Sequence, residues 1–148
     1  MICLKFYYIC NFNLNHLNDK SNISERRKEL RRMASEFAQV AMYNRGFPFP
    51  VTVSKRNIKE ILKQPHKHYA EKNESILRLK SMFEESKFQG ELTRRADEDF
   101  NSFLFETEIA NEPSWFIVRK YDRGNDYLVY SISDQQELKS HIMSKENL

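Results

Sequence analysis

The sequence is poor in the residues that make long flexible linkers, because its 148 residues include only three glycines and four prolines. Disorder is therefore expected only at the ends of the chain. Charge of one sign is also lacking: 24 basic residues nearly balance 21 acidic ones, for a formal net charge of +3. So small an excess does not by itself indicate nucleic-acid binding, and the local placement of charge has to decide.

Cysteine is equally scarce. Cys3 and Cys10 are the only two, they stand close together, and no set of metal ligands lies near them, which predicts reduced intracellular thiols. The first ten residues contain Lys5 and lack both a basic n-region and a small-residue cleavage site, so they do not read as a signal peptide. Their apolar run is also too short to cross a membrane. We expect either an extra strand or a poorly ordered leader, in a cytoplasmic protein.

The length and the apolar content predict one folded domain. Apolar residues make up 40% of the chain and aromatic residues 13%, enough for a single substantial core. Residues 11–22 are rich in Asn, with Asp and Ser, a composition typical of a linker. We therefore expect residues 1–22 to be a leader or linker and residues 23–148 to form one domain.

The first half of that domain has the apolar period of helices. Ser24 is a plausible N-cap for a helix to about Tyr43, and Ser54 for a second helix over residues 57–63. Pro65 either begins a new helix or kinks a continuous one that runs to about Lys87. The basic run in the first helix is more often a solvated face than a binding patch, although it can also contact phosphates.

The second half alternates with a period of two, which predicts strands. Three good candidates and one weaker one, at residues 88–92, are joined by connections of hairpin length. A short extended segment at residues 51–53 precedes them, and a short helix over about residues 134–143 follows. The predicted fold is α+β, with N-terminal helices packed on one face of a three- to four-stranded antiparallel meander. The three good strand candidates are residues 102–109, 114–121 and 126–133.

Strand alternation assigns the side chains to two faces of this sheet. The face under the helices is expected to carry Phe103, Phe116, Val118, Leu128 and Ile132. An acid, a base and a hydroxyl can therefore converge on the open face, but an ordinary cross-strand ion pair beside outward serines fits the same pattern. The predicted open face carries Glu106, Glu108, Arg119, Ser131 and Ser133, together with apolar Trp115 and Ile117.

Two of the four histidines flank Lys67 directly after Pro65. On the expected helix, His66 and His68 fall on opposite margins of the buried stripe, where a histidine usually only packs its ring and forms a hydrogen bond. They make a poor metal site, because residues two apart on a helix do not face each other. No metal ligand is assigned.

Several segments resemble a known group of proteins. The pattern is similar to the barnase, EndoU, colicin and RelE superfamily of metal-independent ribonucleases, and more closely to the nuclease-like domain of large polyvalent proteins of phages and mobile elements. The resemblance covers about residues 23–133. It is carried by residues 51–61, by His68, and by the strand segments 105–109, 115–119 and 127–131.

The resemblance implies a metal-independent endoribonuclease, toxin-like or associated with a mobile element, in which the RNA 2′-hydroxyl attacks its own phosphate without any cofactor. It implies His68 first and His66 second as acid or base, Arg119 as phosphate stabiliser, Glu106 as a possible base and Ser131 as an orienting hydroxyl. Contacts to the phosphate backbone of the RNA would come from three lysines. Those lysines are Lys67, Lys63 and Lys72.

The chain departs from the superfamily in one respect, since related enzymes often carry a catalytic histidine on the last strand and this strand has none. The alternative is an inactive nuclease-fold module that binds RNA, the ribosome or a protein partner. An antitoxin, an immunity protein or a phage protein is the kind of partner expected, and no membrane contact is expected.

Overall fold

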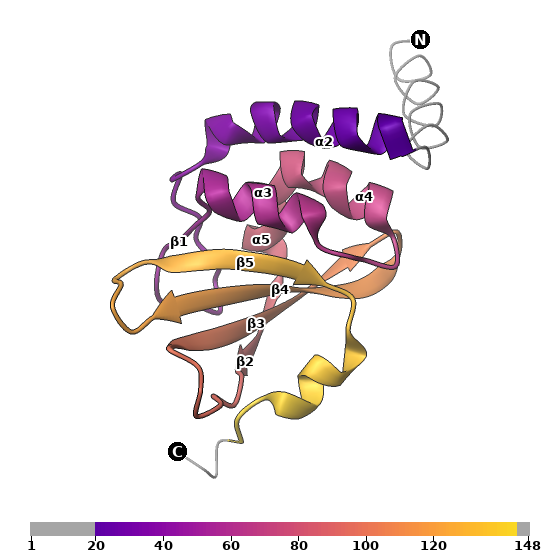
Figure 1. The fold of residues 1–148 in the computed structure, drawn as a ribbon. Helices are drawn as coiled ribbons and strands as arrows, with labels where there is room; N and C mark the ends of the chain where they lie inside the picture. Colours follow the sequence, from indigo (N-terminus) through magenta and orange to yellow (C-terminus); the bar gives the residue numbers. More distant parts are fainter. Residues whose placement is uncertain (1–19, 145–148) are drawn as a thin grey trace.

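The computed structural model describes residues 20–144, and the predictions for residues 1–19, including both cysteines, lie outside this range. A layer of helices covers one face of a five-stranded sheet, and a short 3-10 helix lies at the other side (Figure 1). The helical elements are α2 (Lys20–Ala34), η1 (Ser35–Phe37), α3 (Lys55–Lys63), α4 (Tyr69–Glu74), η2 (Ser75–Arg78), α5 (Leu79–Glu85) and η3 (Gln136–His141). The strands are β1 (Val51–Thr52), β2 (Lys87–Glu91), β3 (Phe100–Ile109), β4 (Glu112–Tyr121) and β5 (Tyr127–Ser133).

Helix α2 is displaced toward the N-terminus relative to its prediction. It begins at Lys20, so Ser24 lies inside it, and it ends at Ala34 instead of near Tyr43. The helix ends early because the chain turns to pair with the segment around β1. Gln39 donates its backbone N–H to Val53 O at 2.9 Å, and Met42 and Val51 exchange backbone hydrogen bonds.

Helix α3 follows its predicted position closely. The Ser54 hydroxyl accepts the backbone N–H of Asn57 at 3.0 Å, and the Asn57 side chain accepts the backbone N–H of Ser54 at 3.0 Å. This reciprocal pair confirms Ser54 as the N-cap. Ile58, Ile61 and Leu62 form the buried face of the helix.

The long helix predicted from Pro65 to Lys87 is wrong. Helix α3 ends at Lys63 and α4 begins only at Tyr69, so Pro65 and both histidines lie in a turn. Gln64 adopts an extended conformation, as the residue before a proline usually does. The rest of the segment is broken into α4, the 3-10 turn η2 and α5.

The sheet is mixed, and the predicted antiparallel meander is therefore only partly correct. The strand order is β1-β5-β4-β3-β2, with antiparallel pairing everywhere except between β1 and β5. Strand β1 pairs in parallel with β5: the helices carry the chain from β1 at one sheet edge to β2 at the other, and the strands β2 to β5 then bring it back beside β1. The weaker strand candidate is confirmed as β2, and the three stronger ones as β3, β4 and β5.

A register shift in β5 overturns one face assignment. The pairing passes from Ile117 with Ser131 to Val118 with Val129, which leaves Tyr130 as an extra residue. Val129 consequently faces the core, and Leu128, predicted to be in the core, pairs with Arg119 on the other face.

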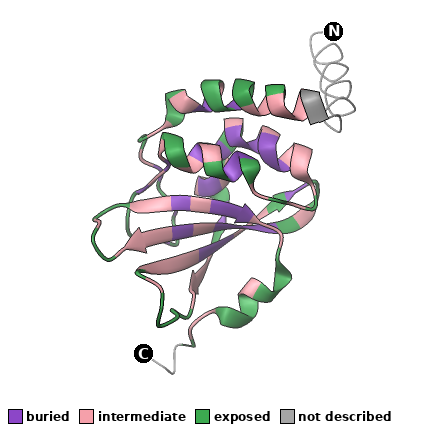
Figure 2. Cartoon of the chain, viewed as in Figure 1, coloured by how far each residue is buried: buried purple, intermediate pink, exposed green. Residues whose placement is uncertain are grey.

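The main core lies between the helices and the sheet. Phe105 and Phe116 are fully buried and contact Phe83 of α5, with ring centroids 4.8 and 5.7 Å away. Figure 2 shows the buried residues concentrated where the helices meet the middle of the sheet, and exposed residues along the outer side of α2. The opposite side of the sheet is called the open face below. Its residues include Leu104, Glu106, Trp115, Ile117, Arg119 and Ser131.

The end of the described chain covers part of this open face. The predicted C-terminal helix is only the 3-10 turn η3, none of whose residues is buried. Ile142 then bridges to Leu92 beside β2. Trp115, predicted as an open-face residue, is completely buried and lies below the Lys139 amino group, 5.7 Å from the ring centroid.

Candidate functional site

The two histidines lie in the turn between α3 and α4 and contact the helix-facing side of the sheet. His66 Nε2 is 3.0 Å from the hydroxyl of Ser114, which is 1% exposed. His66 Nδ1 accepts the backbone N–H of His68 at 2.8 Å. Because Nδ1 is an acceptor, the neutral ring carries its proton on Nε2 and donates it to Ser114. A histidine that activates a serine has the opposite arrangement, since its ring nitrogen accepts the hydroxyl proton.

The protonation of His66 supports a structural role. Burial lowers the pKa of His66 below its usual value, Asp134 opposes this shift, and Lys72 and His68 add to it. Protonating the ring would also break the hydrogen bond from the His68 backbone, because Nδ1 would lose its lone pair. His66 is thus a neutral link between the turn and strand β4.

Lys67 and His68 meet the same carboxylate. Lys67 Nζ lies 2.8 Å from Glu112 Oε2 and His68 Nε2 lies 3.3 Å from it, the second contact without hydrogen-bond alignment. The pKa of Glu112 is lowered by Lys67 and then by His68. The backbone N–H of Lys67 donates to Asp134 Oδ2 at 2.6 Å. We call this group the turn cluster, made up of His66, Lys67, His68, Glu112, Ser114 and Asp134.

Arg119 lies on the open face in an aromatic clamp. Its guanidinium carbon is 3.3 Å from the ring centroid of Tyr130 and 3.8 Å from that of Phe100. One further contact is a long hydrogen bond of 3.4 Å to the Tyr121 hydroxyl. No carboxylate pairs with Arg119 among residues 20–144, so its charge is stabilised mainly by the two rings.

Glu106 is on the same face but forms a separate contact. Its carboxylate lies 3.2 Å from Lys139 Nζ, and its backbone pairs with Trp115, four residues from Arg119 along β4. Four residues span about 13 Å of strand, and the Arg119 side chain leans toward Phe100, at the far end. Glu106 also borders a groove of about 470 Å³ that contains two further glutamates, Glu85 and Glu108.

The five predicted catalytic residues therefore do not meet. His66 and His68 contact the helix-facing side of the sheet, whereas Glu106, Arg119 and Ser131 belong to the open face. Ser131 is 8% exposed and pairs with Ile117 between the other two. In this arrangement the predicted acid, base and phosphate stabiliser do not converge on one point, and their individual roles stay predictions.

The three lysines predicted to bind the RNA backbone lie in different environments. Lys63 is exposed at the end of α3, whereas Lys67 is paired with Glu112. Lys72 is fully buried and donates to Ile61 O at 2.5 Å and to Gln64 O at 2.8 Å, at the C-terminal end of α3. Burial lowers its pKa to about 7, with a smaller effect of Arg27. Of these three lysines, only Lys63 has an amino group that is neither buried nor paired with a carboxylate among residues 20–144.

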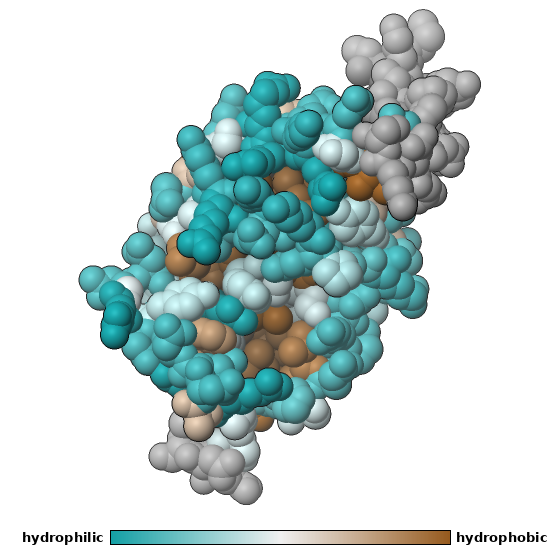
Figure 3. All heavy atoms as spheres, in the orientation of Figure 1, coloured by the Kyte–Doolittle hydropathy of each residue, from teal (hydrophilic) through white to brown (hydrophobic). Residues whose placement is uncertain are grey.

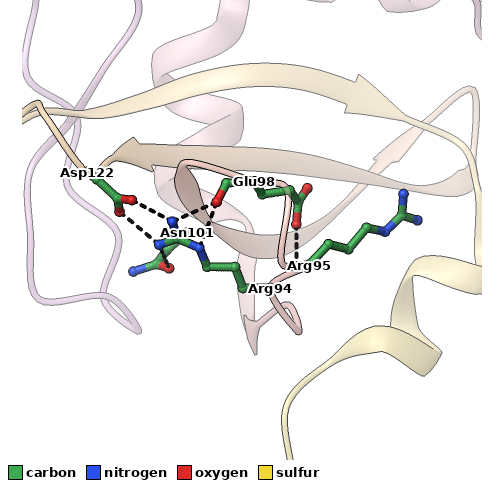
Figure 4. A network of polar contacts seen from close by, with 5 residues as sticks. All are labelled: Arg94, Arg95, Glu98, Asn101 and Asp122. Carbon is green, nitrogen blue, oxygen red and sulfur yellow. Dashed lines mark hydrogen bonds and ion pairs between the residues drawn. The ribbon is translucent and has the colours of Figure 1, made fainter.

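A surface network holds the loop before β3. Arg94 binds both carboxylate oxygens of Asp122, at 2.8 and 2.5 Å, and the backbone carbonyl of Glu98 (Figure 4). It also contacts Asn101, while the Arg95 side chain extends away from the group. This network ties the loop to the end of β4 and engages the Arg94 guanidinium.

Neither a metal site nor a membrane-spanning helix occurs in the part of the chain that the structure describes. Within residues 20–144 no three His, Cys, Asp or Glu side chains are placed to hold a metal ion. No helix in the described range combines the length and the apolar character that a membrane span requires.

A protein-family model matches most of the chain. The model of large polyvalent protein-associated domain 3 matches residues 21–130. The chain belongs to this family. The match confirms the predicted link to large polyvalent proteins but does not extend to the nuclease superfamily, which stays a prediction. Neither the curated proteins nor the solved structures gave a match.

Several residues that define these contacts were not predicted. Ser114 and Glu112 carry no sequence signal as histidine partners, because the pairing depends on a turn that was expected to be helix. Tyr130 becomes a partner of Arg119 only through the register shift in β5. A lysine inside an apolar stripe is the one available hint of the burial of Lys72.

Proposed function

We propose that this domain binds RNA through its outer helices and does not cleave it. The observation that supports this is the charge of α2 and α3, which together contain ten basic and three acidic residues. The whole chain has 24 basic and 21 acidic residues, so the part outside these two helices holds 14 basic and 18 acidic residues. The positive charge is thus concentrated in two adjacent helices, in keeping with a phosphate-binding surface.

Most of these cations are available to a ligand. Arg26 is engaged by Glu74 and Glu29, and Arg27 lies near buried Lys72, but seven others have no ion pair within the described range. With about 100° between successive residues, the four basic side chains of α3 fall on one flank, away from buried Ile61. Figure 3 shows hydrophilic side chains over this helical layer. The seven are Lys28, Arg31, Arg32, Lys55, Arg56, Lys59 and Lys63.

The separation of the predicted catalytic groups supports binding without cleavage. The His66 ring nitrogens are both engaged, and Arg119 and Glu106 point to different parts of the open face. A phosphate held on α2 and α3 would lie on the far side of the core from the open face. Binding of phosphates needs only cations, whereas cleavage needs an acid and a base at the same atom.

The test is binding of a labelled single-stranded RNA at several salt concentrations. If five or more phosphates are contacted, the logarithm of affinity should fall with the logarithm of salt with a slope of about −3.5 or steeper. The variant Arg31→Glu with Arg32→Glu should weaken binding and reduce the slope by about 1.4. The matched control is Arg95→Glu with Arg123→Glu, which reverses the charge of two exposed arginines in the loops that join the strands.

Equal loss of affinity in both double variants would overturn the α2 and α3 assignment, because total charge alone would then explain binding. Cleavage is tested separately with the full chain in EDTA. Production of cyclic-phosphate ends that is lost in a His66→Ala, His68→Ala double variant would overturn the non-cleaving proposal and restore the histidine roles.

A further inference from the structure

The C-terminal segment, residues 135–143, lies across the edge of the open face and adds to the edge of the sheet next to β2. Thr93 donates its backbone N–H to His141 O at 2.7 Å, and Met143 donates to Glu91 O at 2.8 Å. Between them, Leu92 and Ile142 form an antiparallel bridge. These are the contacts of an added strand, which lets any polypeptide pair with the edge irrespective of its side chains.

The surface under this segment has a recess for one aliphatic side chain. Gly90 has φ +134°, at a register shift in β2, and a Cβ there would lie 2.8 Å from Ile142 Cγ2. The absence of a side chain at Gly90 therefore creates the space that Ile142 occupies. This recess selects an aliphatic residue at one position of whatever segment lies on the edge.

A second contact selects a basic residue three positions earlier. Lys139 Nζ lies 3.2 Å from Glu106 and above the ring of Trp115. Trp115 is fully buried, and its indole N–H has no hydrogen-bond partner within the described residues. The surface thus offers a carboxylate, an aromatic face and an unused donor close together.

The η3 part of the segment is weakly attached. None of the residues of η3 is buried, and the side chains of the Lys139 and Glu106 ion pair are 48% and 28% exposed. An ion pair this exposed contributes little. The segment also lies beyond residues 21–130, the part of the chain that the family model matches. The segment is therefore held by its edge pairing and by Ile142 more than by η3, so loss of these few contacts would uncover the surface.

We propose that this surface is a docking site for a polypeptide segment of another protein, and that residues 135–143 occupy it in the absence of that partner. The partner segment carries a lysine or arginine that meets Glu106 and Trp115. It carries an isoleucine or valine three residues later that fills the recess at Gly90. Its backbone adds to the edge at Glu91 and Thr93.

Trp115 is the only tryptophan in the sequence, so its fluorescence reports directly on this surface. The experiment uses the full chain and acrylamide quenching. The wild type should be protected, and Ile142→Asp should increase quenching several-fold by releasing the segment. The probe is a synthetic peptide of residues 134–144, which has to reach about millimolar concentration to compete with a tethered segment.

Added peptide should restore protection to Ile142→Asp, and a peptide with Lys139→Glu should restore less at the same concentration, because its carboxylate would face Glu106. A peptide with Ile142→Gly should bind about tenfold more weakly, the loss expected for one aliphatic side chain. Gln136→Asp, an exposed change in the same segment, is the control and should quench like the wild type. Far-UV circular dichroism checks that the variants are folded.

Three outcomes would overturn the proposal: unchanged quenching in Ile142→Asp, no protection by the peptide, or equal protection by the Lys139→Glu peptide. If Ile142→Asp is unfolded, Ile142→Gly replaces it to release the segment, and Glu106→Gln is added to that variant. Binding of the peptide to Glu106→Gln should then lose its dependence on Lys139. Retained dependence would refute the assigned contact.

Discussion

Replacing Lys72 by methionine should change the way stability depends on pH. The amino group is fully buried, has no carboxylate partner within the described residues, and donates to the carbonyls of Ile61 and Gln64. Its pKa is about 7 in the folded protein and 10.5 in its ordinary environment. The unfolded chain therefore binds one more proton than the folded protein between these two values.

The direction in which stability changes with pH follows from this difference in bound protons. Below pH 7 both states are protonated and the folded state bears the full cost of the buried ammonium, so stability is lowest there. As pH rises from 7 toward 10.5 the folded state is neutral while the unfolded state still has to lose its proton, and stability increases. At 1.36 kcal/mol per pKa unit, the increase between pH 6 and pH 9 is about 2.5 kcal/mol.

Lys72→Met keeps the length of the side chain but removes the titrating group. It leaves the Gln64 carbonyl without its donor, a loss of about 1–3 kcal/mol, whereas Ile61 O retains the backbone N–H of Gln64. Relative to wild type, the variant should therefore be about 2.5 kcal/mol more destabilised at pH 9 than at pH 6. Urea unfolding followed by Trp115 fluorescence measures both values.

Lys63→Met is the matched control, because Lys63 is exposed at the end of α3 and its replacement should have an effect independent of pH. If Lys72→Met shifts the free energy of unfolding by the same amount at pH 6 and pH 9, Lys72 does not lose its proton in the folded state. The argument from burial would then be wrong.

Three smaller predictions concern individual contacts. Ser54→Ala removes the cap of α3 and should lower the free energy of unfolding by about 1 kcal/mol in urea titrations. Ser114→Ala leaves the His66 N–H without its acceptor and should cost about 1–3 kcal/mol by the same measurement, without weakening RNA binding. Gly90→Ala combines a strained backbone with a contact to Ile142, and calorimetry should show a lower Tm than for Ser114→Ala.

The elements that the sequence predicts well are those determined by neighbouring residues. The Ser54 cap and the buried Ile58, Ile61 and Leu62 all lie within one short segment, and the structure confirms them. Strands β3, β4 and β5 follow the alternation of their own side chains. In each case the pattern is local, so no information about distant segments is needed.

The errors arise where a distant segment decides the local structure. Residues 39 and 42 leave the helical pattern because they pair with residues 51–53, and Tyr130 is the extra residue where β5 pairs with β4. His66 is held in a turn by Ser114, which is 48 residues away. Since the candidate site was assigned from the same patterns, the histidines and Arg119 were expected together and lie on different sides of the sheet.

The two proposed binding surfaces are separated by the core, so a change at one surface should not affect binding at the other. The cations lie on α2 and α3 above the helix-facing side of the sheet, while Glu106, Trp115 and Gly90 lie on the open face or its edge (Figure 1). Changes at distant sites with no shared contacts usually have additive effects. Ile142→Asp should therefore leave RNA affinity unchanged, and Arg31→Glu with Arg32→Glu should leave Trp115 protected. Coupling between the two would have to pass through the packed rings of Phe83, Phe105 and Phe116, and close-packed cores resist rearrangement.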